Sequence, residues 1–538
     1  MNIAISGVIM ASMLTIPAHA QDKTSEIDKI FSWTTPTAPG CVCAVSQNGK
    51  LIVNRAYGSA DLERNVPIDT NTIFDAGSIQ KQFVAAATLL LVEDGKIALT
   101  DDIHKYIPEL PDYGSTITID QLMTHTSGLR EWTGLLTFAG DKPTVYNLIL
   151  RQHQLNFKPG ESWSYSTSGF VLLKEVVARV SKMLFGEFMQ RRIFDTLGMQ
   201  SSSYRDNMRD IIKNRALAYE RDGSGQWKMA MLLDNDRGGG GVLTTASDML
   251  IWNDAITYHR LGKFVSGKLQ EPAVLNNGRK LTYGHGLFLD TYRGTKEIWH
   301  SGSADGYKSW LGRYTEHGLS IAIMCNSGDG TDRIEFAHKI FELLLPAVTQ
   351  PDFDPAPAPV KDLDPDKLAG LFFNEATGEP LRIAVQKGRL RVAEGPGLEQ
   401  ISNDRFKRRG SMVSFMANDE FEIHYLSNDQ FELKSMEGKI TKYRRAKAFA
   451  PKEAELKAYE GRYESEELRS AIIVSIGKNG LECRFEHMGD RKLPLAPVDP
   501  DVFQVSRVTI HFLRDKQGKV EALTFSNPLA RHMKFKKS

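Results

Sequence analysis

The chain lacks an excess of charge of either sign, and this absence excludes several kinds of partner. Lys and Arg together number 67 and Asp and Glu 66, so the net charge of the 538 residues is +1. No basic block is interleaved with aromatic residues. The electrostatic features of a protein that binds nucleic acid or an anionic membrane are therefore missing.

Cysteine is also scarce, with only four in the chain. No Cys-x-x-Cys and no His/Cys spacing typical of a zinc site occurs, so the sequence predicts no metal. Cys41 and Cys43 are two residues apart in a predicted strand, face the same side of it and cannot easily pair with each other. Cys325 and Cys483 are isolated in the sequence, so the four cysteines do not decide whether the protein is exported.

No apolar run is long enough to cross a bilayer as a helix, so no stable membrane span is expected. The mostly apolar segment from Ile3 to Pro17 ends at Ala18-His19-Ala20, which offers small residues at the two positions that a signal peptidase reads. No Lys or Arg precedes this segment. We nevertheless expect a signal peptide at residues 1–20 and an exported protein, periplasmic or secreted.

The length exceeds that of one compact core, and a cluster of prolines indicates where the chain divides. Five prolines between residues 346 and 359 predict an extended linker. Before them, β-type runs near both ends enclose helical patterns, which predicts one antiparallel sheet flanked by helices. Asn48-Gly49 predicts a tight hairpin at the start of that sheet.

After the prolines the sequence repeats itself at intervals of about 87 to 91 residues, which predicts two copies of a small antiparallel β-barrel. Gly370-Leu371-Phe372 returns as Gly461-Arg462-Tyr463, and His424 returns as His511. We interpret the two histidines as strand-face residues, not as metal ligands. The predicted division is a catalytic domain at 24–346, a linker at 347–362, and barrels at 363–447 and 452–538.

Ser78 and Lys81 form the first candidate catalytic pair. Three residues span about one helical turn, so both side chains lie on one face of a helix. Apolar residues then recur at three- and four-residue steps to Leu91, which predicts a buried helix ending at Gly95. A desolvated lysine can accept the proton of a serine hydroxyl, so the pair is typical of acyl transfer. Ser475 and Lys478 share the spacing but lie in a β-type run.

Two further segments offer partners for this pair. Tyr165 lies on a polar loop after Pro159-Gly160, and we expect a neighbouring ammonium to lower its pKa and make it a proton shuttle. His300 begins the segment His300-Ser301-Gly302-Ser303 on a predicted edge strand, where Gly302 permits close backbone approach of an extended substrate. The backbone N–H groups of Ser78 and Ser303 are the candidate oxyanion hole.

The ordered segments Ser78 to Lys81, Tyr165 and His300 resemble the serine β-lactamase and penicillin-binding-protein superfamily, in its class C-like branch with D-aminopeptidases and esterases. The resemblance spans residues 28–345 and includes the Leu122–Leu129 and Gly238–Gly241 segments. It implies an α/β (α+β) catalytic domain with an antiparallel sheet flanked by helices, and the two barrels resemble the D-aminopeptidase architecture. His125 lies in a segment that is a structural turn in family members, and no Gly-x-Ser-x-Gly elbow of an α/β-hydrolase occurs.

Three departures from the family pattern bear on the substrate. Thr167 stands where many relatives have Asn, and its shorter hydroxyl weakens the inference that this side chain hydrogen-bonds to a peptide carbonyl of the substrate. His300 stands where carboxypeptidases and β-lactamases usually have Lys, which favours substrates with a free amine or no terminal charge. The short hairpin predicted at 502–512 leaves little room for the long loop that restricts the active site of D-aminopeptidases, so we expect a more open site.

The resemblance implies a serine hydrolase that forms an acyl-enzyme on amide or ester bonds, most closely a D-aminopeptidase or D-amino-acid amidase. Esterase, DD-peptidase and β-lactamase activities remain alternatives, as does a penicillin-binding or cell-wall-sensing protein that acylates without turnover. The expected catalytic residues are Ser78, Lys81, Tyr165 and His300, with Thr167, Ser301 and Gly302 in substrate binding. No cofactor is implied, the expected partner is a short D-amino-acid peptide or ester, and a homo-oligomer is left open.

Overall fold

The structure, a computed structural model, describes residues 18–231, 241–329, 332–348, 364–376, 378–386, 388–392, 397–408, 421–435, 440–447, 449–506 and 508–538. The predicted linker at 347–362 and the predicted signal peptide at 1–20 lie largely outside these residues, as does most of the Gly238–Gly241 segment. Among the described residues, no helix combines the length and the apolarity that a membrane span requires.

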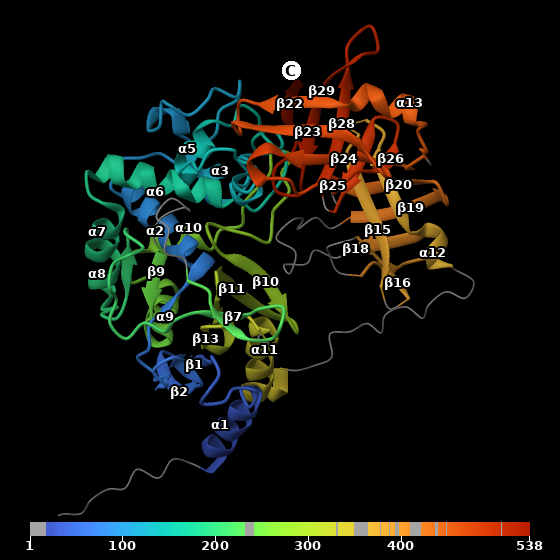
Figure 1. Cartoon of the computed structure of the whole chain (residues 1–538). Coiled ribbons are helices and arrows are strands. Elements are labelled where there is room, and N and C mark those ends of the chain that lie inside the picture. Colours follow the sequence, from blue (N-terminus) through green and yellow to red (C-terminus); the bar gives the residue numbers. More distant parts are fainter. Residues whose placement is uncertain are drawn as a thin grey trace, which may run out of the picture.

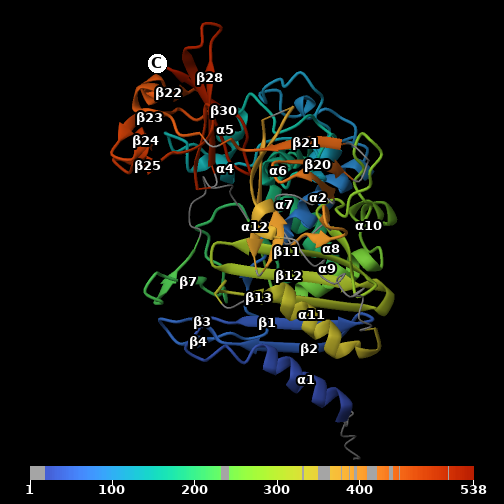
Figure 2. The same ribbon diagram turned by 90° about the vertical axis from the view of Figure 1, so that its right-hand side faces the viewer.

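A six-stranded antiparallel sheet forms the centre of the N-terminal part, residues 18–348. The strands lie in the order β10, β11, β12, β13, β1, β2 and are stacked in Figure 2. Their bounds are Phe288–Tyr292, Thr295–Ala304, Tyr307–Tyr314, Leu319–Cys325, Cys41–Gln47 and Lys50–Tyr57. Because β1 pairs with β13, runs from both ends of this part meet in one sheet, as the sequence predicts.

Two local features fix the start of this sheet. Asn48 and Gly49 join β1 to β2 with φ angles of 50° and 73°, the positive values that a two-residue hairpin turn requires, so the predicted hairpin is confirmed. The register of β1 on β13 places Cys41 opposite Cys325, and a disulfide joins them. The pairing register brings these two cysteines together, which their positions in the sequence do not reveal.

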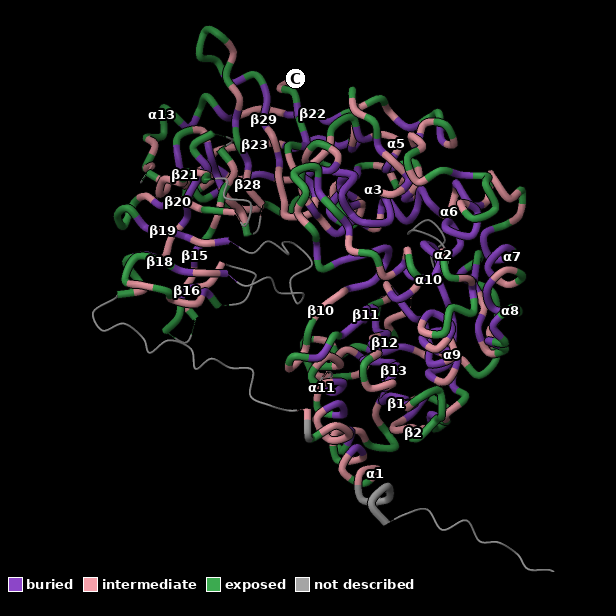
Figure 3. Tube along the Cα trace, turned by 180° about the vertical axis from the view of Figure 1, so that it is seen from behind, coloured by how far each residue is buried: buried purple, intermediate pink, exposed green. Residues whose placement is uncertain are grey.

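Helices cover both faces of the sheet, as Figures 1 and 2 show. On one face lie α1 (Ala18–Ile30) and α11 (Arg333–Leu344), and on the other lies α9 (Ala246–Thr257). Successive side chains of a strand point to opposite faces, so β1 contributes to a core on each side of the sheet. Val42 and Ala44 belong to the larger helical core, whereas Cys43 and Val45 pack on the side of α1 and α11. The chain through the middle of this part consists largely of buried residues (Figure 3).

The larger core is completed by α2 (Gln80–Glu93), α6 (Thr167–Ser181) and α10 (Lys263–Leu269), and α2 packs against both of the others. The sequence predicts a buried helix at the position of α2, and its side chains from Lys81 to Leu91 are buried. A short 3-10 turn, η1 (Gly77–Ile79), precedes it. Smaller elements are α3 (Ile119–Met123), α4 (Thr133–Leu136), α5 (Val145–Leu150), α7 (Phe185–Met189), α8 (Asp195–Leu197), β3 (Ser59–Asp61), β4 (Val66–Pro67), β5 (Phe74–Asp75), β6 (Ser203–Arg205), β7 (Tyr219–Arg221), β8 (Trp227–Met229) and β9 (Gly241–Thr244).

Two curled antiparallel sheets follow, which we call the first β module (residues 364–447) and the second β module (residues 449–538). The first has the order β16-β15-β14-β21-β20-β19-β18-β17, with bounds Arg389–Val392, Pro380–Gln386, Gly370–Asn374, Ile440–Arg445, Gln430–Ser435, Phe421–Ser427, Arg405–Arg408 and Glu399–Gln400. The second has the order β25-β24-β23-β22-β30-β29-β28-β27-β26, with bounds Leu493–Pro494, Gly480–Phe485, Ser470–Gly477, Gly461–Ser465, Met533–Lys537, Val520–Ser526, Val508–Arg514, Val502–Val505 and Ala496–Asp499.

Eight strands follow the same order in the two modules, and the second module has β25 as an additional strand at one edge. In each, the first strand pairs with the last, as β14 with β21 and β22 with β30. His424 on β19 and His511 on β28 occupy corresponding strands. Among the described residues the outermost strands of each sheet are not hydrogen-bonded to each other, so both sheets are curled rather than closed.

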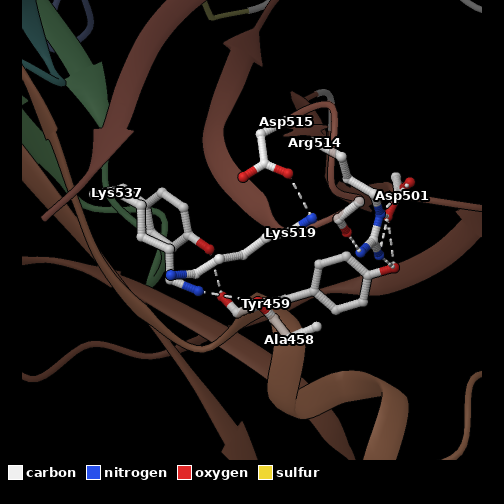
Figure 4. Close-up of polar contacts among 9 residues, drawn as sticks. Ala458, Tyr459, Asp501, Arg514, Asp515, Lys519 and Lys537 are labelled. Atoms are coloured by element: carbon white, nitrogen blue, oxygen red, sulfur yellow. Dashed lines mark hydrogen bonds and ion pairs between the residues drawn. The ribbon is translucent and has the colours of Figure 1, made fainter.

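Polar side chains tie the last strands of the second module to the segment that enters it (Figure 4). The Arg514 guanidinium, at the end of β28, donates to Asp501 at 2.7 Å and to the Tyr459 hydroxyl at 3.2 Å. Tyr459 in turn donates to Asp501 at 2.8 Å. The strands β27 and β28 pair from Val505 opposite Val508 to Val502 opposite His511, so the predicted short hairpin at 502–512 is confirmed.

Candidate active site

Ser78 and Lys81 lie at the start of α2, where η1 turns into the helix. The Lys81 amine donates to Ser78 Oγ at 3.3 Å. Ser78 is half-buried and Lys81 is 2% exposed, and the rings of Tyr165 and Phe170 lie 4.7 and 5.6 Å from the Lys81 amine. Ser475 and Lys478, a pair that shares this spacing by chance, do not form a similar site. As predicted, Ser475 lies on a strand, β23, and it donates a hydrogen bond to Glu482.

Burial lowers the pKa of Lys81 to about 7, because the charged ammonium loses its hydration. Glu131 opposes this effect and raises the pKa, whereas Lys174 on α6 lowers it further. A lysine tuned in this way is uncharged in an appreciable fraction of molecules near neutral pH, and it is then able to accept a proton.

Tyr165 lies just before α6 and completes a group of three. A hydrogen bond joins its phenol to Ser78, and Lys81 Nζ lies 4.7 Å from the centre of its ring. Burial raises the pKa of Tyr165 well above 10, an effect that outweighs the hydrogen bond to Ser78. The expectation that a neighbouring ammonium lowers this pKa is therefore wrong: desolvation of the phenolate dominates.

The strand that carries His300 is internal for half its length and an edge for the rest. β10 pairs with β11 only as far as Trp299, whereas β12 pairs with it from Ile298 to Ala304. Residues 300–304 therefore have a strand on one side and, within the described residues, none on the other. The predicted edge strand is this second half of β11.

The 3-10 turn η1 packs directly against Gly302 and Ser303 of β11. A Cβ on Gly302 would lie 2.0 Å from the Ala76 carbonyl oxygen, and a Cβ on Gly77, whose φ is +56°, would lie 2.5 Å from Ser303 N. Ser309 on β12 fixes this contact by donating to the same Ala76 oxygen at 2.7 Å. The two segments that carry the predicted oxyanion donors, Ser78 and Ser303, are thus adjoining, and the assignment of the donors stays a prediction.

His300 is fully buried, with its ring 5.0 Å from that of Phe288 and 6.1 Å from that of Tyr165. Burial, followed by the charge of Lys81, lowers its pKa to about 3. The imidazole is therefore neutral, in agreement with the sequence-based expectation. Ser301 is also buried, and its carbonyl oxygen lies 2.6 Å from His300 Nδ1, so this nitrogen carries the ring proton.

His125 belongs to the same buried group, and within the described part of the chain its ring nitrogens hydrogen-bond to Ser166 and Tyr283, not to Ser78. Its Nδ1 accepts from Ser166 N at 3.0 Å, so the proton of the neutral ring lies on Nε2, 3.1 Å from the Tyr283 hydroxyl. Tyr283 lies 3.4 Å from His300 Nε2 and donates to it. This chain of hydrogen bonds connects the Tyr165 loop with β11, which agrees with a structural role for the His125 segment.

Sequence reasoning missed Glu131, which is buried beside Lys81. Its carboxylate accepts from the backbone N–H groups of Thr167 and Ser168 and from Thr133 Oγ1. Burial raises its pKa, and the charge of Lys81 opposes that effect. The acid follows the Leu122–Leu129 segment directly, but nothing in the sequence distinguishes it from a surface glutamate.

Arg333, the first residue of α11, was also missed. Its guanidinium donates to Ser303 Oγ at 3.3 Å and to the Ser309 carbonyl at 2.9 Å. Ser303 is exposed, so this cation borders the free edge of β11. No local pattern links Arg333 to the site, because α11 lies about 250 residues from Ser78 along the chain.

Comparisons with known proteins agree with this geometry. A family model described as Beta-lactamase matches residues 32–345, and a domain of unknown function, DUF3471, matches residues 445–537. D-aminopeptidase from Cereibacter sphaeroides is 25% identical over 483 residues, which cover 87% of this chain and 88% of that protein.

Two solved structures share the fold. The octameric penicillin-binding protein homologue from Pyrococcus abyssi has a TM-score of 0.52 at 22% identity, with 79% of this chain and 98% of that chain covered. D-amino acid amidase from Ochrobactrum anthropi SV3, complexed with L-phenylalanine, has a TM-score of 0.51 at 21% identity, with 62% and 99% covered.

Proposed function

The chain belongs to the β-lactamase family of serine hydrolases, and on that premise we propose that it hydrolyses amides of D-amino acids through an acyl-enzyme on Ser78. One observation carries the proposal: Lys81 Nζ lies 3.3 Å from Ser78 Oγ, and burial lowers the pKa of that amine to about 7. A serine is a competent nucleophile only when a base of this kind is in reach.

In the proposed reaction, the neutral Lys81 amine takes the proton of Ser78 as Oγ attacks the substrate carbonyl carbon. The backbone N–H groups of Ser78 and Ser303 stabilise the oxyanion that forms. Tyr165, held protonated by burial, gives its proton to the leaving amine as the amide bond breaks and regains one from Lys81. Attack by water on the ester then releases the acid and restores Ser78.

The neutral state of His300 supports a substrate that presents no carboxylate at this strand, because a neutral imidazole offers no fixed positive charge. Among the described residues, no strand pairs with residues 300–304 of β11 on the side away from β12, which supports pairing of this edge with an extended substrate. Ser301 lies on this edge, and Thr167 begins α6 two residues after Tyr165. The D-aminopeptidase relative over 87% of the chain favours a D-amino-acid amide.

Arg333 favours a second candidate, a DD-peptidase. Its guanidinium is 3.3 Å from the exposed Ser303 and supplies, from α11, a positive charge that His300 does not. Guanidinium groups bind carboxylates in a bidentate manner, so a peptide ending in a free carboxylate would have a partner at this position.

The test is a panel of three substrates, D-alanine p-nitroanilide, a short nitrophenyl ester and nitrocefin, together with a peptide ending in D-Ala-D-Ala. We expect turnover of the anilide, and a loss of at least about a thousandfold in kcat for Ser78→Ala, the scale of loss seen when a nucleophile is removed. The matched control is Ser475→Ala, which changes the chance Ser-Lys pair and leaves kcat unchanged.

Other outcomes of these assays would identify a different activity. Preference for the D-Ala-D-Ala peptide, lost in Arg333→Ala, selects the DD-peptidase, and turnover of only the ester or nitrocefin selects an esterase or β-lactamase. A stable mass increase at Ser78 with a β-lactam, without release over hours, identifies a penicillin-binding protein that does not turn over. No turnover and no acylation of any of them overturns the proposal.

We also propose that the protein is exported, as its N-terminal segment predicts. The disulfide between Cys41 and Cys325 supports this proposal, because disulfides persist in oxidising compartments and are rare in the cytosol. Fractionation of the producing cells, with the N-terminus of the mature protein determined by mass spectrometry, tests it.

A further inference from the structure

The Arg130–Glu131 segment lies between the candidate active site and the second β module. Glu131 N donates to the Leu529 carbonyl at 3.1 Å. The Arg130 guanidinium donates to Glu467 Oε2 at 2.9 Å and to the His532 carbonyl at 3.1 Å. Arg130 is 2% exposed, and a buried guanidinium is stable only when it is paired, so this segment and the module fix each other.

Further hydrogen bonds join the second β module to the chain around the Arg130–Glu131 segment. Asn156 Nδ2 donates to the Leu529 carbonyl at 3.0 Å, and Arg531 N donates to Asn156 Oδ1 at 2.9 Å. Asn527 Nδ2 donates to the Gly134 carbonyl at 2.7 Å. The turn at residues 527–532, between β29 and β30, is therefore a part of the module that contacts the N-terminal part on both sides of Glu131. It is a different turn from the 502–512 hairpin.

Apolar packing continues the same interface. Leu135 on α4 and Leu148 on α5 are fully buried in the hydrophobic core of the second β module. The ring of Phe138 lies 4.6 Å from that of Phe525 and 5.2 Å from that of Phe485. The module thus shares its core with the chain that directly follows Glu131, and this part of the chain cannot move independently of it.

The Glu131 side chain points the other way, to α6. The first N–H groups of a helix have no partner within it, and Glu131 accepts those of Thr167 and Ser168. A carboxylate is favoured at this helix end by the helix dipole as well. Tyr165 lies two residues before Thr167, so the position of Glu131 fixes where the loop with the phenol enters α6.

We propose that Glu131 is a positioning residue of the Ser78 centre, and that the second β module holds it in place through the turn at 527–532. Glu131 acts in two ways: it anchors the start of α6 behind Tyr165, and it places a negative charge beside the Lys81 amine. The inference rests on the proposed hydrolase function, because its main consequence is the protonation of the base.

The charge has a defined effect on pH dependence. The groups that face Lys81 are Glu131, Tyr165, Lys174 and the neutral imidazoles of His125 and His300. Of these, only Glu131 raises the pKa of Lys81. Removing its charge therefore lowers this pKa further, and the pH at which Lys81 becomes a base falls.

The experiment compares the pH profiles of kcat/KM for the full-length protein and Glu131→Gln. We expect the acidic limb to move to lower pH by about one unit, the order of shift that a nearby opposite charge produces. Glutamine keeps an acceptor oxygen for the N–H groups of α6 and so preserves the fold. Glu131→Asp, which keeps the charge, should return the limb towards its original position.

The dependence on the module is tested at the interface. Asn156→Ala removes the two hydrogen bonds that the Asn156 side chain makes with the 527–532 turn and changes no residue of the active site. We expect the acidic limb of the kcat/KM profile of this variant to move to lower pH, as in Glu131→Gln, but by a smaller amount. Arg469→Ala is the matched control, because Arg469 joins the same module to Asp141, away from Glu131. Its profile should stay unchanged.

Hydrogen exchange supplies a readout that does not need turnover. The amides of Thr167 and Ser168 should exchange faster in Asn156→Ala than in Arg469→Ala, because only the first variant loosens Glu131. An unchanged acidic limb in Glu131→Gln, in a protein whose hydrolysis depends on Ser78, overturns the positioning role alone. Equal exchange in both interface variants overturns the role of the module, whether or not the protein is a hydrolase.

Discussion

At the scale of single residues, burial determines the proton chemistry of this site. Lys81 and Tyr165 are 2% and 9% exposed, and burial disfavours the charged form of each. The pKa of the amine falls and that of the phenol rises, so both side chains are neutral at slightly alkaline pH. One is then ready to accept a proton and the other still holds one, which is the pairing that acyl transfer requires.

The first prediction concerns the base. The kcat/KM of the protein should rise with pH through about 7, because only the uncharged amine, which predominates above its pKa, can accept the Ser78 proton. Lys81→Arg should lower kcat/KM by about 100- to 10,000-fold and remove this limb, since a guanidinium does not lose its proton. Steady-state kinetics between pH 5 and pH 9 measure both effects.

Lys478→Arg is the matched control, because it makes the same change in the chance Ser475 pair on β23. Its profile should coincide with that of the unaltered protein. A Lys81→Arg variant that retains full activity would show that another group deprotonates Ser78.

At the scale of elements, the site depends on how closely η1 approaches the edge of β11. The Gly77 and Gly302 positions lack a Cβ, and an added carbon at either would lie within 2.5 Å of backbone atoms of the other segment. Ser309 on β12 holds the same contact through the Ala76 carbonyl. The positions of Ser78 and of the second half of β11 are therefore set by backbone contact rather than by side-chain contact.

The second prediction follows from this contact. In Gly302→Ala the new methyl would lie 2.0 Å from the Ala76 oxygen, so β11 must move away from Ser78. Because a displacement of about 1 Å in a catalytic geometry costs about a hundredfold, we expect kcat/KM to fall by at least that factor. The hydrolysis assay measures the loss, and circular dichroism verifies that the sheet persists.

Gly267→Ala provides the comparison, since a Cβ on this residue of α10 meets no atom within 4 Å. Alanine in a helix is more favourable than glycine, so this variant should keep its activity and gain about 0.5–1 kcal/mol of stability. Equal activity of the two variants would rule out the backbone contact as a determinant of the site.

At the scale of the whole molecule, the second β module is a structural continuation of the N-terminal part. Its hydrophobic core includes Leu135, Ala139 and Leu148 from the N-terminal part, and its 527–532 turn contacts the segment of Glu131. The two β modules also contact each other, through Arg444 and Asp499. Unfolding of the second module therefore exposes apolar surface of the part that carries Ser78.

The third prediction tests this shared core. Leu135→Ala should lower the free energy of unfolding by about 2–5 kcal/mol, the usual cost of a cavity at a fully buried leucine. All seven tryptophans lie between residues 33 and 310, so their fluorescence reports the N-terminal part alone. A lower urea midpoint of this signal measures the coupling.

Leu184→Ala, at a side chain that is 69% exposed, should leave the midpoint almost unchanged. An unchanged midpoint in Leu135→Ala as well would show that the second module does not stabilise the N-terminal part.

Sequence patterns of short range predicted local structure well. The Asn48-Gly49 hairpin, the buried helix after Ser78, the strand around Ser475 and the repeated β modules all depend on residues within a few positions, or on a repeat, and each is present. The sheet assembled from both ends of the N-terminal part was predicted from β-type runs. The pairing of Cys41 with Cys325 was not, because it depends on the register of two strands 284 residues apart.

The sequence by itself determined the order of the three motifs, the helical spacing of Ser78 and Lys81, and the family to which the chain belongs, because these depend only on residue types and their order along the chain. Only the tertiary structure decided which charges surround them. Glu131 and Arg333 reach the site through folding, and burial reverses the expected direction of the Tyr165 pKa. Desolvation and long-range contact depend on three-dimensional packing, which local sequence patterns do not encode.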